Sequence, residues 1–397
     1  MNGYRCFACD TTQDAGFSGW ACPSCGGNLD VLNDHDTIIE QVKKSPFDTA
    51  RIPLQIGNTP LYHARRLGQT VGLRNLYLKD DTVNPSASSK DRASAAVVLQ
   101  ALDAGARIVS VASTGNAGSS TACVAAAAGL EAVVLVPETA PVAKLTQALS
   151  FGAHVLAVRG NYDDAFDLCL TASEKYGWFN RCTGINPFTR EGKKVCAWEI
   201  WASLDGRVPD RVVVPTGDGN LLSGMWKGWR ELMAVGLIDR LPKVDCAQSE
   251  RSDAISRTVR AVRSKGEPDW ASVRIQAVEA QTIADSISVN LPRDGLAATR
   301  AVIESGGEAI TVPDHEIIAA IPEMASATGV FPEPAAATPW AAIKQMMKDR
   351  RIAPDELVVC LVSGNGLKDI AHAQDAVGTP QIIDPTIEAV AAVLGEP

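Results

Sequence analysis

From about residue 50 onward, short apolar runs rich in β-branched residues alternate with stretches of helical pattern, and this alternation restricts the fold more than any other feature of the sequence. Each apolar run is of strand length, and the runs at 107–112, 212–215 and 357–362 lead into glycine-containing turns. Such alternation predicts an α/β fold of mostly parallel sheets whose faces are covered by helices. The predicted strands are residues 107–112, 132–136, 154–158, 212–215 and 357–362, and the predicted helices are 93–102, 117–128, 143–151, 162–176 and 221–233.

The composition fits a globular protein of two or three domains. The 397 residues are 46% hydrophobic and 21% charged, which is enough to bury a substantial core. A net charge of −9, without a basic stripe, argues against nucleic acid and an anionic membrane surface as partners. No run approaches the roughly 20 apolar residues that a spanning helix needs. The N-terminus also lacks the apolar core of a signal peptide, so a cytoplasmic protein is expected.

Four of the ten cysteines lie in the first 25 residues, as the pairs Cys6/Cys9 and Cys22/Cys25. Residues 1–33 are too few to build a hydrophobic core, so a module of this length needs another element, such as a bound metal ion or disulfides, to hold it together. Two facing Cys-x2-Cys pairs place four thiolates at the corners of a tetrahedron, which is the geometry of closed structural Zn²⁺ sites. Iron also suits four thiolates. Two disulfides would need an oxidising compartment, which no other feature of the sequence indicates.

Four turns at strand ends or helix starts are candidate ligand sites, because ligands of such folds gather where parallel strands end. The first turn places Lys90 at the start of a predicted helix. The positive end of a helix lowers the pKa of a lysine and favours the neutral amine that Schiff-base chemistry needs. The backbone N–H groups of 217–220 can cradle an anion, but the turn lacks the Lys-Ser/Thr of a nucleotide P-loop. Taken singly, each turn also fits an ordinary strand–helix connection, and Lys90 a solvated lysine. The other two turns are 113–118 and 362–369.

Together, the turns resemble the motifs of threonine synthases and, more broadly, of the second fold type of pyridoxal-phosphate (PLP) enzymes, the tryptophan synthase beta-like superfamily. Residues 89–92, Ser-Lys-Asp-Arg, are similar to the family's Phe-Lys-Asp-Arg, whose lysine holds PLP. Residues 113–116 match Ser-Thr-Gly-Asn, and 363–369 resemble Thr-Gly-His-Gly-Leu-Lys-Asp. The resemblance extends from the cysteine-rich finger to about Asp369, and it includes 57–61 (Gly-Asn-Thr-Pro-Leu), 282–287 and 333–337.

This resemblance implies a PLP-dependent carbon–oxygen lyase of amino-acid biosynthesis, acting by β- or γ-elimination or replacement and converting O-phosphohomoserine to threonine. It implies that Lys90 is the Schiff-base lysine and the base that removes the α-proton. Asn116 would meet the phenolic oxygen of PLP, and Ser363 its pyridine nitrogen. The residues implied for the PLP phosphate are Gly217, Asp218, Gly219 and Asn220, and those implied for the substrate are Ser113, Thr114, Ala117, Thr183 and Arg190.

Three positions depart from the family where it binds the substrate phosphate. Ala117 occupies a position where the family has threonine, Gly184 one where it has serine, and Thr189 one where it has arginine. Arg190 follows one position later. Because a phosphate needs charge-assisted donors, these changes weaken recognition of O-phosphohomoserine. An anionic group would then be met by Arg190, Lys193 or Lys194. Two alternatives stay open: a related dehydratase or replacement enzyme with a non-phosphorylated amino acid substrate, and a non-catalytic zinc-finger binding protein, against which the intact Lys90 argues.

The expected organisation is a finger followed by two interleaved domains. Residues 1–33 form the zinc-ribbon-like module, 34–85 with 190–397 the large PLP-binding domain, and 86–189 a small α/β domain. The polar, weakly patterned segment from about 249 to 270 is predicted as an excursion between core elements. A homodimer that binds a small-molecule amino acid substrate, with no nucleic acid and no membrane partner, is expected.

Overall fold

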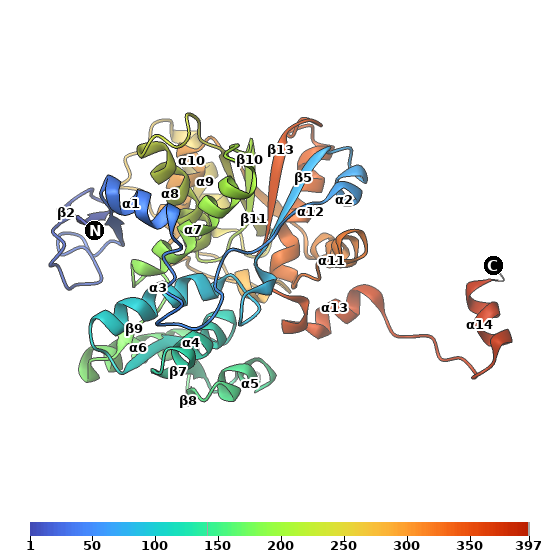
Figure 1. The fold of residues 1–397 in the computed structure, drawn as a ribbon, viewed down its shortest axis with the longest axis horizontal. Coiled ribbons are helices and arrows are strands. Elements are labelled where there is room, and N and C mark those ends of the chain that lie inside the picture. Colours follow the sequence, from blue (N-terminus) through green and yellow to red (C-terminus); the bar gives the residue numbers. More distant parts are fainter. Residues whose placement is uncertain (141, 396–397) are drawn as a thin grey trace.

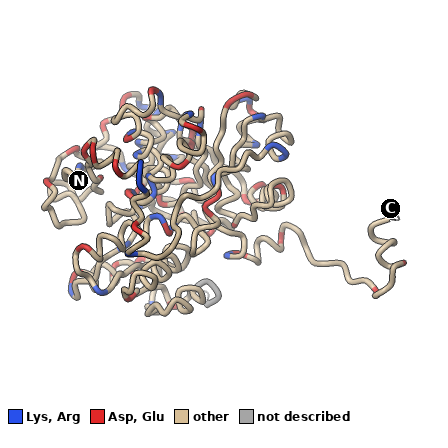
Figure 2. The backbone as a smooth tube through the Cα atoms, in the orientation of Figure 1, with Lys and Arg blue, Asp and Glu red and all other residues tan. Residues whose placement is uncertain are grey.

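The computed structural model describes residues 1–140 and 142–395, and it has an α/β architecture with two main sheets covered by helices. A small antiparallel sheet at the N-terminus lies at one side of the body (Figure 1). Helix α14 (Ile387–Leu394) stands apart from the body at the other end and buries none of its residues (Figure 1). Lysines and arginines are interspersed with aspartates and glutamates along the chain (Figure 2). Within the described ranges, no helix has the length and apolarity required to cross a membrane.

The larger sheet has six strands, and all its neighbouring pairs are parallel except one edge pair, in which β4 runs antiparallel to β5. Its central strands are almost entirely apolar, because helices cover both faces of the sheet. The predicted parallel arrangement is therefore confirmed, with one antiparallel edge added. In spatial order the strands are β12 (Ala309–Val312), β11 (Lys243–Ser249), β10 (Arg211–Pro215), β13 (Leu357–Val362), β5 (Asn75–Asp80) and β4 (Leu61–His63).

The smaller sheet has four parallel strands joined by helical crossovers. All four strands fall within residues 86–189, and all six strands of the larger sheet fall outside that range. The sheets thus follow the expected division, although the domain boundaries themselves stay a prediction. In order the strands are β8 (His154–Val158), β7 (Glu131–Pro137), β6 (Ile108–Ala112) and β9 (Phe179–Asn180), and the connecting helices are α4 (Asn116–Ala127), α5 (Val142–Ser150) and α6 (Tyr162–Tyr176).

The helices around the larger sheet include one that the sequence analysis missed. The segment predicted as an excursion forms α9 (Ala254–Lys265), so that prediction is wrong. Ile255, Val259 and Val262 are spaced by one helical turn and are buried, but the arginines between them hide this pattern. The remaining helices are α1 (His35–Lys43), α2 (Arg65–Gln69), α3 (Lys90–Asp103), α7 (Phe188–Ser203), α8 (Asn220–Ala234), α10 (Gly295–Glu304), α11 (Asp314–Thr328), α12 (Pro334–Lys348) and α13 (Ile370–Val377).

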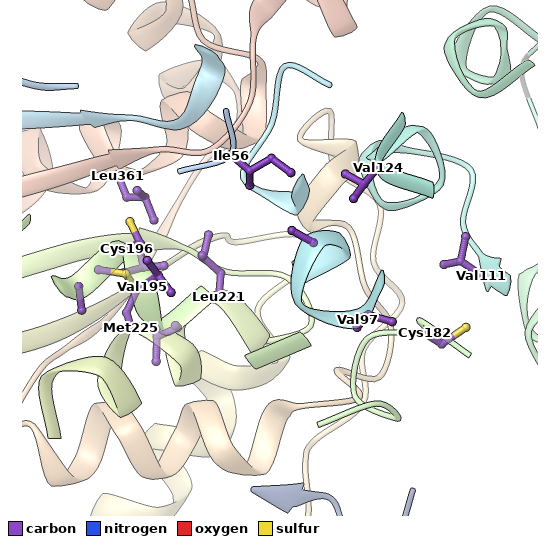
Figure 3. Packing of buried hydrophobic residues seen from close by; sticks show 14 of the residues in the cluster. Ile56, Val97, Val111, Val124, Cys182, Val195, Cys196, Leu221, Met225 and Leu361 are labelled. Atoms are coloured by element: carbon purple, nitrogen blue, oxygen red, sulfur yellow. The ribbon is translucent and has the colours of Figure 1, made fainter. Parts of the chain in front are cut away.

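One hydrophobic core joins the two sheets. Figure 3 shows side chains from the smaller sheet and its helices, such as Val111 and Val124, in the same cluster as Leu221 of α8 and Leu361 of β13. Val97 of α3 lies between these groups (Figure 3). Because a closely packed core deforms little, it fixes the strand ends of the two sheets relative to each other.

A buried ionic network holds the N-terminal turn of α3 in place. Arg92 is fully buried and donates from Nε to Asp81 Oδ2 at 2.8 Å and from Nη1 to Glu199 Oε1 at 2.7 Å. Lys79 Nζ donates to the other oxygen of Glu199 at 2.7 Å. Burial on its own would raise the pKa of Glu199, but the charges of Arg92 and Lys79 outweigh it and lower the pKa to about 2. Each cation in this network therefore has a carboxylate partner.

We expect the substitution Glu199→Gln to lower the free energy of unfolding by about 3 kcal/mol at pH 7, because buried Lys79 loses its carboxylate partner and buried Arg92 keeps only Asp81. The pKa of Glu199 is lower in the folded than in the unfolded protein, so its contribution is present above pH ~4.5 and is lost as the pH falls towards about 2. Urea unfolding across this range should show a flatter pH dependence for the variant. The control is Glu131→Gln, which breaks an exposed pair with His154. Equal stability of the two variants would contradict the expectation.

Candidate active site

The four candidate turns line one cavity of about 860 Å³. Three of them directly follow strands: the turn at Ser113 follows β6, that at Gly217 follows β10, and Ser363 follows β13. The cavity thus lies at the carboxyl ends of parallel strands from both sheets, where ligands of such folds bind. A second hollow of about 730 Å³ is bordered by Asn75 and Leu357, which begin β5 and β13, and so lies at the opposite edge of the larger sheet.

Lys90 is the first residue of α3, and its side chain lines the cavity. The backbone N–H of Ser89 donates to Ser363 O at 2.8 Å, which holds the first turn beside the fourth. Within the described part of the chain, Lys90 Nζ has neither a hydrogen-bond partner nor an ion-pair partner. Burial lowers the pKa of Lys90, and the positive charge of Arg181 lowers it further. The lowered pKa favours the neutral amine, and an unbonded neutral amine can act as a nucleophile or as a base.

Asn116, in the second turn, begins α4 and is joined to the fourth turn through Glu333. Its Nδ2 donates to Glu333 Oε1 at 2.9 Å and to Ser286 Oγ at 3.1 Å. The backbone N–H of Glu333 in turn donates to Gly364 O at 2.9 Å. Burial raises the pKa of Glu333. The other predicted residues of the second turn, Ser113, Thr114 and Ala117, line the same cavity.

The third turn, residues 217–220, has the backbone of an anion site. A Cβ on Gly217 would come within 2.9 Å of Ile287 Cα, and Gly219 has a φ of +91°, so glycine is required at both positions. Helix α8 begins at Asn220 without a side-chain cap, which leaves backbone N–H groups at its start available to an anion. Lys193 Nζ donates to Asn220 Oδ1 at 2.7 Å, and burial, together with the charges of Lys90 and Arg181, lowers the pKa of Lys193.

Asp218, in the same turn, uses its carboxylate in a contact with the backbone of a neighbouring segment. Its Oδ1 accepts from the backbone N–H of Arg293 at 3.0 Å. Burial raises the pKa of Asp218. The turn is therefore joined to the segment that precedes α10.

The structure does not bring Arg190 to the cavity, contrary to the prediction that it meets an anionic substrate. Arg190 is 2% exposed, and its guanidinium donates to Asp294 Oδ1 at 2.5 Å and to Leu29 O at 3.0 Å. The Arg190 guanidinium also lies over the aromatic ring of Phe7 in the finger, with Cζ 4.4 Å from the ring centroid. Arg190 therefore fastens the finger to the body.

Of the two alternatives to Arg190, only Lys193 lines the cavity. Lys194 Nζ is 2.7 Å from Glu191 Oε2 and 3.0 Å from Glu231 Oε2, so its charge is already neutralised. Thr189 does not line the cavity, and its Oγ1 donates to Asn186 O at 2.7 Å.

Arg181 is a cavity residue that the sequence analysis missed. It lines the cavity beside Thr183 and follows the two-residue strand β9. A strand of two residues gives no periodic signal, so its position could not be read from the pattern. Tyr162, Arg293 and Glu333 also line the cavity, as do residues of 285–291, which continue the recognised 282–287 stretch.

The four N-terminal cysteines form a single cluster. The Sγ atom of Cys9 is 3.7 Å from that of Cys22 and 3.4 Å from that of Cys25, while Cys6 and Cys25 are 3.5 Å apart. All four Sγ atoms lie within 4.8 Å of one another, and none is in a disulfide. Cys6 ends β1 (Gly3–Cys6) of the antiparallel sheet, and the other three lie in the connections between β1, β2 (Thr12–Gln13) and β3 (Leu29–Leu32).

Comparison with known proteins agrees with this geometry. Residues 52–364 match the family model described as pyridoxal-phosphate dependent enzyme. The chain is 35% identical to a threonine synthase of Methanosarcina acetivorans, with 98% of each chain covered. It is 34% identical to a threonine synthase of Methanocaldococcus jannaschii, with 99% of each covered.

The fold is similar to that of a solved threonine deaminase isoform 2 from Solanum lycopersicum, with a TM-score of 0.70 and 19% identity, covering 88% of this chain and 96% of the other. At that identity the likeness concerns the fold alone. The match over residues 52–364 spans all four turns and the whole cavity between the two sheets. The chain belongs to the pyridoxal-phosphate dependent enzyme family, as a threonine synthase-like member.

Proposed function

We propose that this protein is a PLP-dependent carbon–oxygen lyase that converts O-phosphohomoserine to threonine. The observation that carries the proposal is the pairing of two anchors in one cavity: the unbonded amine of Lys90 and the uncapped start of α8. A small ligand that carries both an aldehyde and a phosphate needs an amine to bind the aldehyde and an anion site to bind the phosphate. The naming of relatives over nearly the whole chain as threonine synthases supports the choice of reaction.

The cavity fits PLP in size and in donor set. Its volume of about 860 Å³ falls in the range of small-molecule sites, roughly 300–1,000 Å³. Lys90 would hold the cofactor aldehyde, and Gly217, Gly219 and Asn220 its phosphate through the start of α8. Asn116 would face the phenolic oxygen, and Ser363 the pyridine nitrogen.

When bound, PLP supplies an electron sink for the electrons released at the substrate α-carbon. The Lys90 amine takes the α-proton at Nζ, and its lowered pKa favours the neutral form that can do so. Ser113 and Thr114, at the turn before α4, orient the amino acid substrate. Ser363 offers the cofactor ring a neutral hydroxyl rather than a carboxylate, which favours elimination over transamination.

A second candidate function is a related elimination or replacement on a non-phosphorylated amino acid. It is favoured by Ala117, which lines the cavity without offering a hydroxyl, and by Arg190, whose charge is used elsewhere. A panel of O-phosphohomoserine, threonine, serine and O-acyl amino acids separates the two. We expect kcat/KM of roughly 10⁴ M⁻¹s⁻¹ or more for O-phosphohomoserine. Comparable turnover of another amino acid with little conversion of O-phosphohomoserine would establish the second function.

We also propose that the cysteine cluster of the finger binds one structural Zn²⁺ ion. Four ligands at about 2.3 Å from a tetrahedral ion lie about 3.8 Å from one another, close to the Sγ separations of 3.4 to 3.7 Å in the cluster. Iron would be held in the same way. With four thiolates used, no position is left for a substrate.

We expect one metal ion per chain, zinc rather than iron, in protein purified without chelator. Replacing Cys9 by serine removes one of four ligands and should lower the bound metal to well below one equivalent. The buried Cys123, far along the chain from the cluster, provides the control Cys123→Ala, which should keep its metal. Elemental analysis measures both, and full metal content in the Cys9 variant would refute the site.

The division into a large domain of 34–85 with 190–397 and a small domain of 86–189 is proposed on the separation of the two sheets. A cytoplasmic location is proposed because all ten cysteines are free, as in a reducing compartment. The homodimer is proposed on the family resemblance.

A further inference from the structure

Arg181 differs from the other deeply buried arginines in having no counter-charge. Arg92 is paired with Asp81 and Glu199, and Arg211 is paired with Asp245 and Glu356. Arg181 is fully buried, yet it forms no ion pair with a carboxylate of the described residues. Burial lowers the pKa of Arg181 to about 10. An uncompensated buried cation is destabilising, so its presence in a cavity wall indicates an anionic ligand.

The guanidinium of Arg181 is held in a fixed orientation and keeps an unused donor. The backbone N–H of Arg181 donates to Ser110 O at 2.8 Å, which fixes the residue to the edge of β6. Nε donates to Ser94 Oγ at 3.2 Å, and Nη1 donates to Thr183 Oγ1 at 3.0 Å. Nη2 is buried and has no hydrogen-bond partner.

Thr183 completes the arrangement. Its Oγ1 accepts a hydrogen bond from Arg181, so its own hydroxyl hydrogen remains available to a ligand. Both residues line the cavity. A guanidinium N–H and a hydroxyl side by side match the oxygens of a phosphate group.

Arg181 and Thr183 lie on a different part of the cavity wall from the site proposed for the cofactor phosphate. That phosphate is assigned to the start of α8, which follows β10 of the larger sheet and where Lys193 Nζ donates to Asn220 Oδ1. Arg181 and Thr183 follow β9 of the smaller sheet, whose neighbour β6 leads to the turn at Ser113. The cavity therefore has two separate places for an anion, one beside each sheet.

We propose that Arg181 and Thr183 bind the phosphate monoester of the amino acid substrate. This inference rests on the proposed function and deepens it. It supplies the charge-assisted donor that Ala117, Gly184 and Thr189 do not provide. The buried Arg181 takes the place that the sequence analysis gave to Arg190.

The test uses the holoenzyme, with inorganic phosphate as the probe of the anion site. Binding is measured by equilibrium dialysis with labelled phosphate, and PLP content is measured in parallel. The change Arg181→Gln should leave PLP content as in the unaltered protein and weaken phosphate binding roughly 30-fold or more. The KM for O-phosphohomoserine should rise by a similar factor. The control Arg240→Gln, in the hollow at the other edge of the sheet, should change neither.

The variant Thr183→Val keeps Arg181 in place and should weaken phosphate binding roughly 5-fold. It therefore tests the site even if the Arg181 variant does not fold. Unchanged phosphate binding in both variants, or loss of PLP from the Arg181 variant, would overturn the inference. If phosphate binds to the unaltered protein and not to the Arg181 variant, but O-phosphohomoserine is not converted, the anion site stands and the proposed function fails.

Discussion

The Lys90→Ala protein is expected to lose roughly 10³-fold or more in kcat on its amino acid substrate. The reason is that the Lys90 amine, whose pKa is lowered, is proposed both to hold the cofactor and to act as the base at the α-carbon. Steady-state assays with saturating PLP measure the loss. Lys243→Ala, which removes an exposed lysine at the start of β11, is the control and should be fully active.

Chemical rescue distinguishes a missing amine from a damaged fold. Truncating Lys90 to alanine leaves space for a small molecule, so added methylamine should restore part of the activity of Lys90→Ala in a concentration-dependent manner. It should have no effect on the Lys243 variant. Activity of Lys90→Ala within tenfold of the unaltered protein would exclude Lys90 from this role.

The second large effect is expected from Asp294→Ala. The Asp294 carboxylate is fully buried and accepts from Arg190 Nη2 at 2.5 Å, from Asn28 Nδ2 at 3.2 Å and from Asn220 Nδ2 at 2.9 Å. It thus joins the finger to the start of α8. Its loss leaves Arg190 with Asp30, at the longer distance of 3.3 Å, as its carboxylate partner and should lower the free energy of unfolding by about 3–5 kcal/mol.

The Asp294 variant should also bind PLP more weakly, because Asn220 loses the partner that orients it at the proposed phosphate site. Denaturant unfolding and a PLP titration measure the two effects on the same preparation. Asp163→Ala, which removes the exposed partner of Arg293, is the control and should change neither. An Asp294 variant as stable as the Asp163 variant would show that the finger and α8 are not coupled through this carboxylate.

The sequence predicted those parts of the cavity that are encoded locally. The glycines before α8 and the turn at Ser113 each follow from a local strand–turn–helix pattern, and Lys90 follows from its place at the start of a predicted helix. Parallel sheets bring the carboxyl ends of their strands to one edge, so separate turns meet there. These residues therefore line one cavity, as expected of the fold.

The residues that the sequence misplaced depend on distant partners. Arg190 lies one position from a family arginine, but its carboxylates, Asp30 and Asp294, are 160 and 104 residues away along the chain. Arg181 follows a strand too short to give a pattern, and its contact with Ser94 spans 87 residues. Which arginine enters the cavity is decided by these tertiary contacts, which no local pattern reports.

Borohydride reduction of the purified holoenzyme tests the central claim most directly, because it fixes PLP to the lysine that holds it. Proteolysis and mass spectrometry then identify the labelled peptide. The geometry predicts one pyridoxyl group per chain, on Lys90 and on no other lysine of the cavity. A label on Lys193, or no label in protein that contains a full equivalent of PLP, would contradict the assignment of Lys90 and with it the proposed active site.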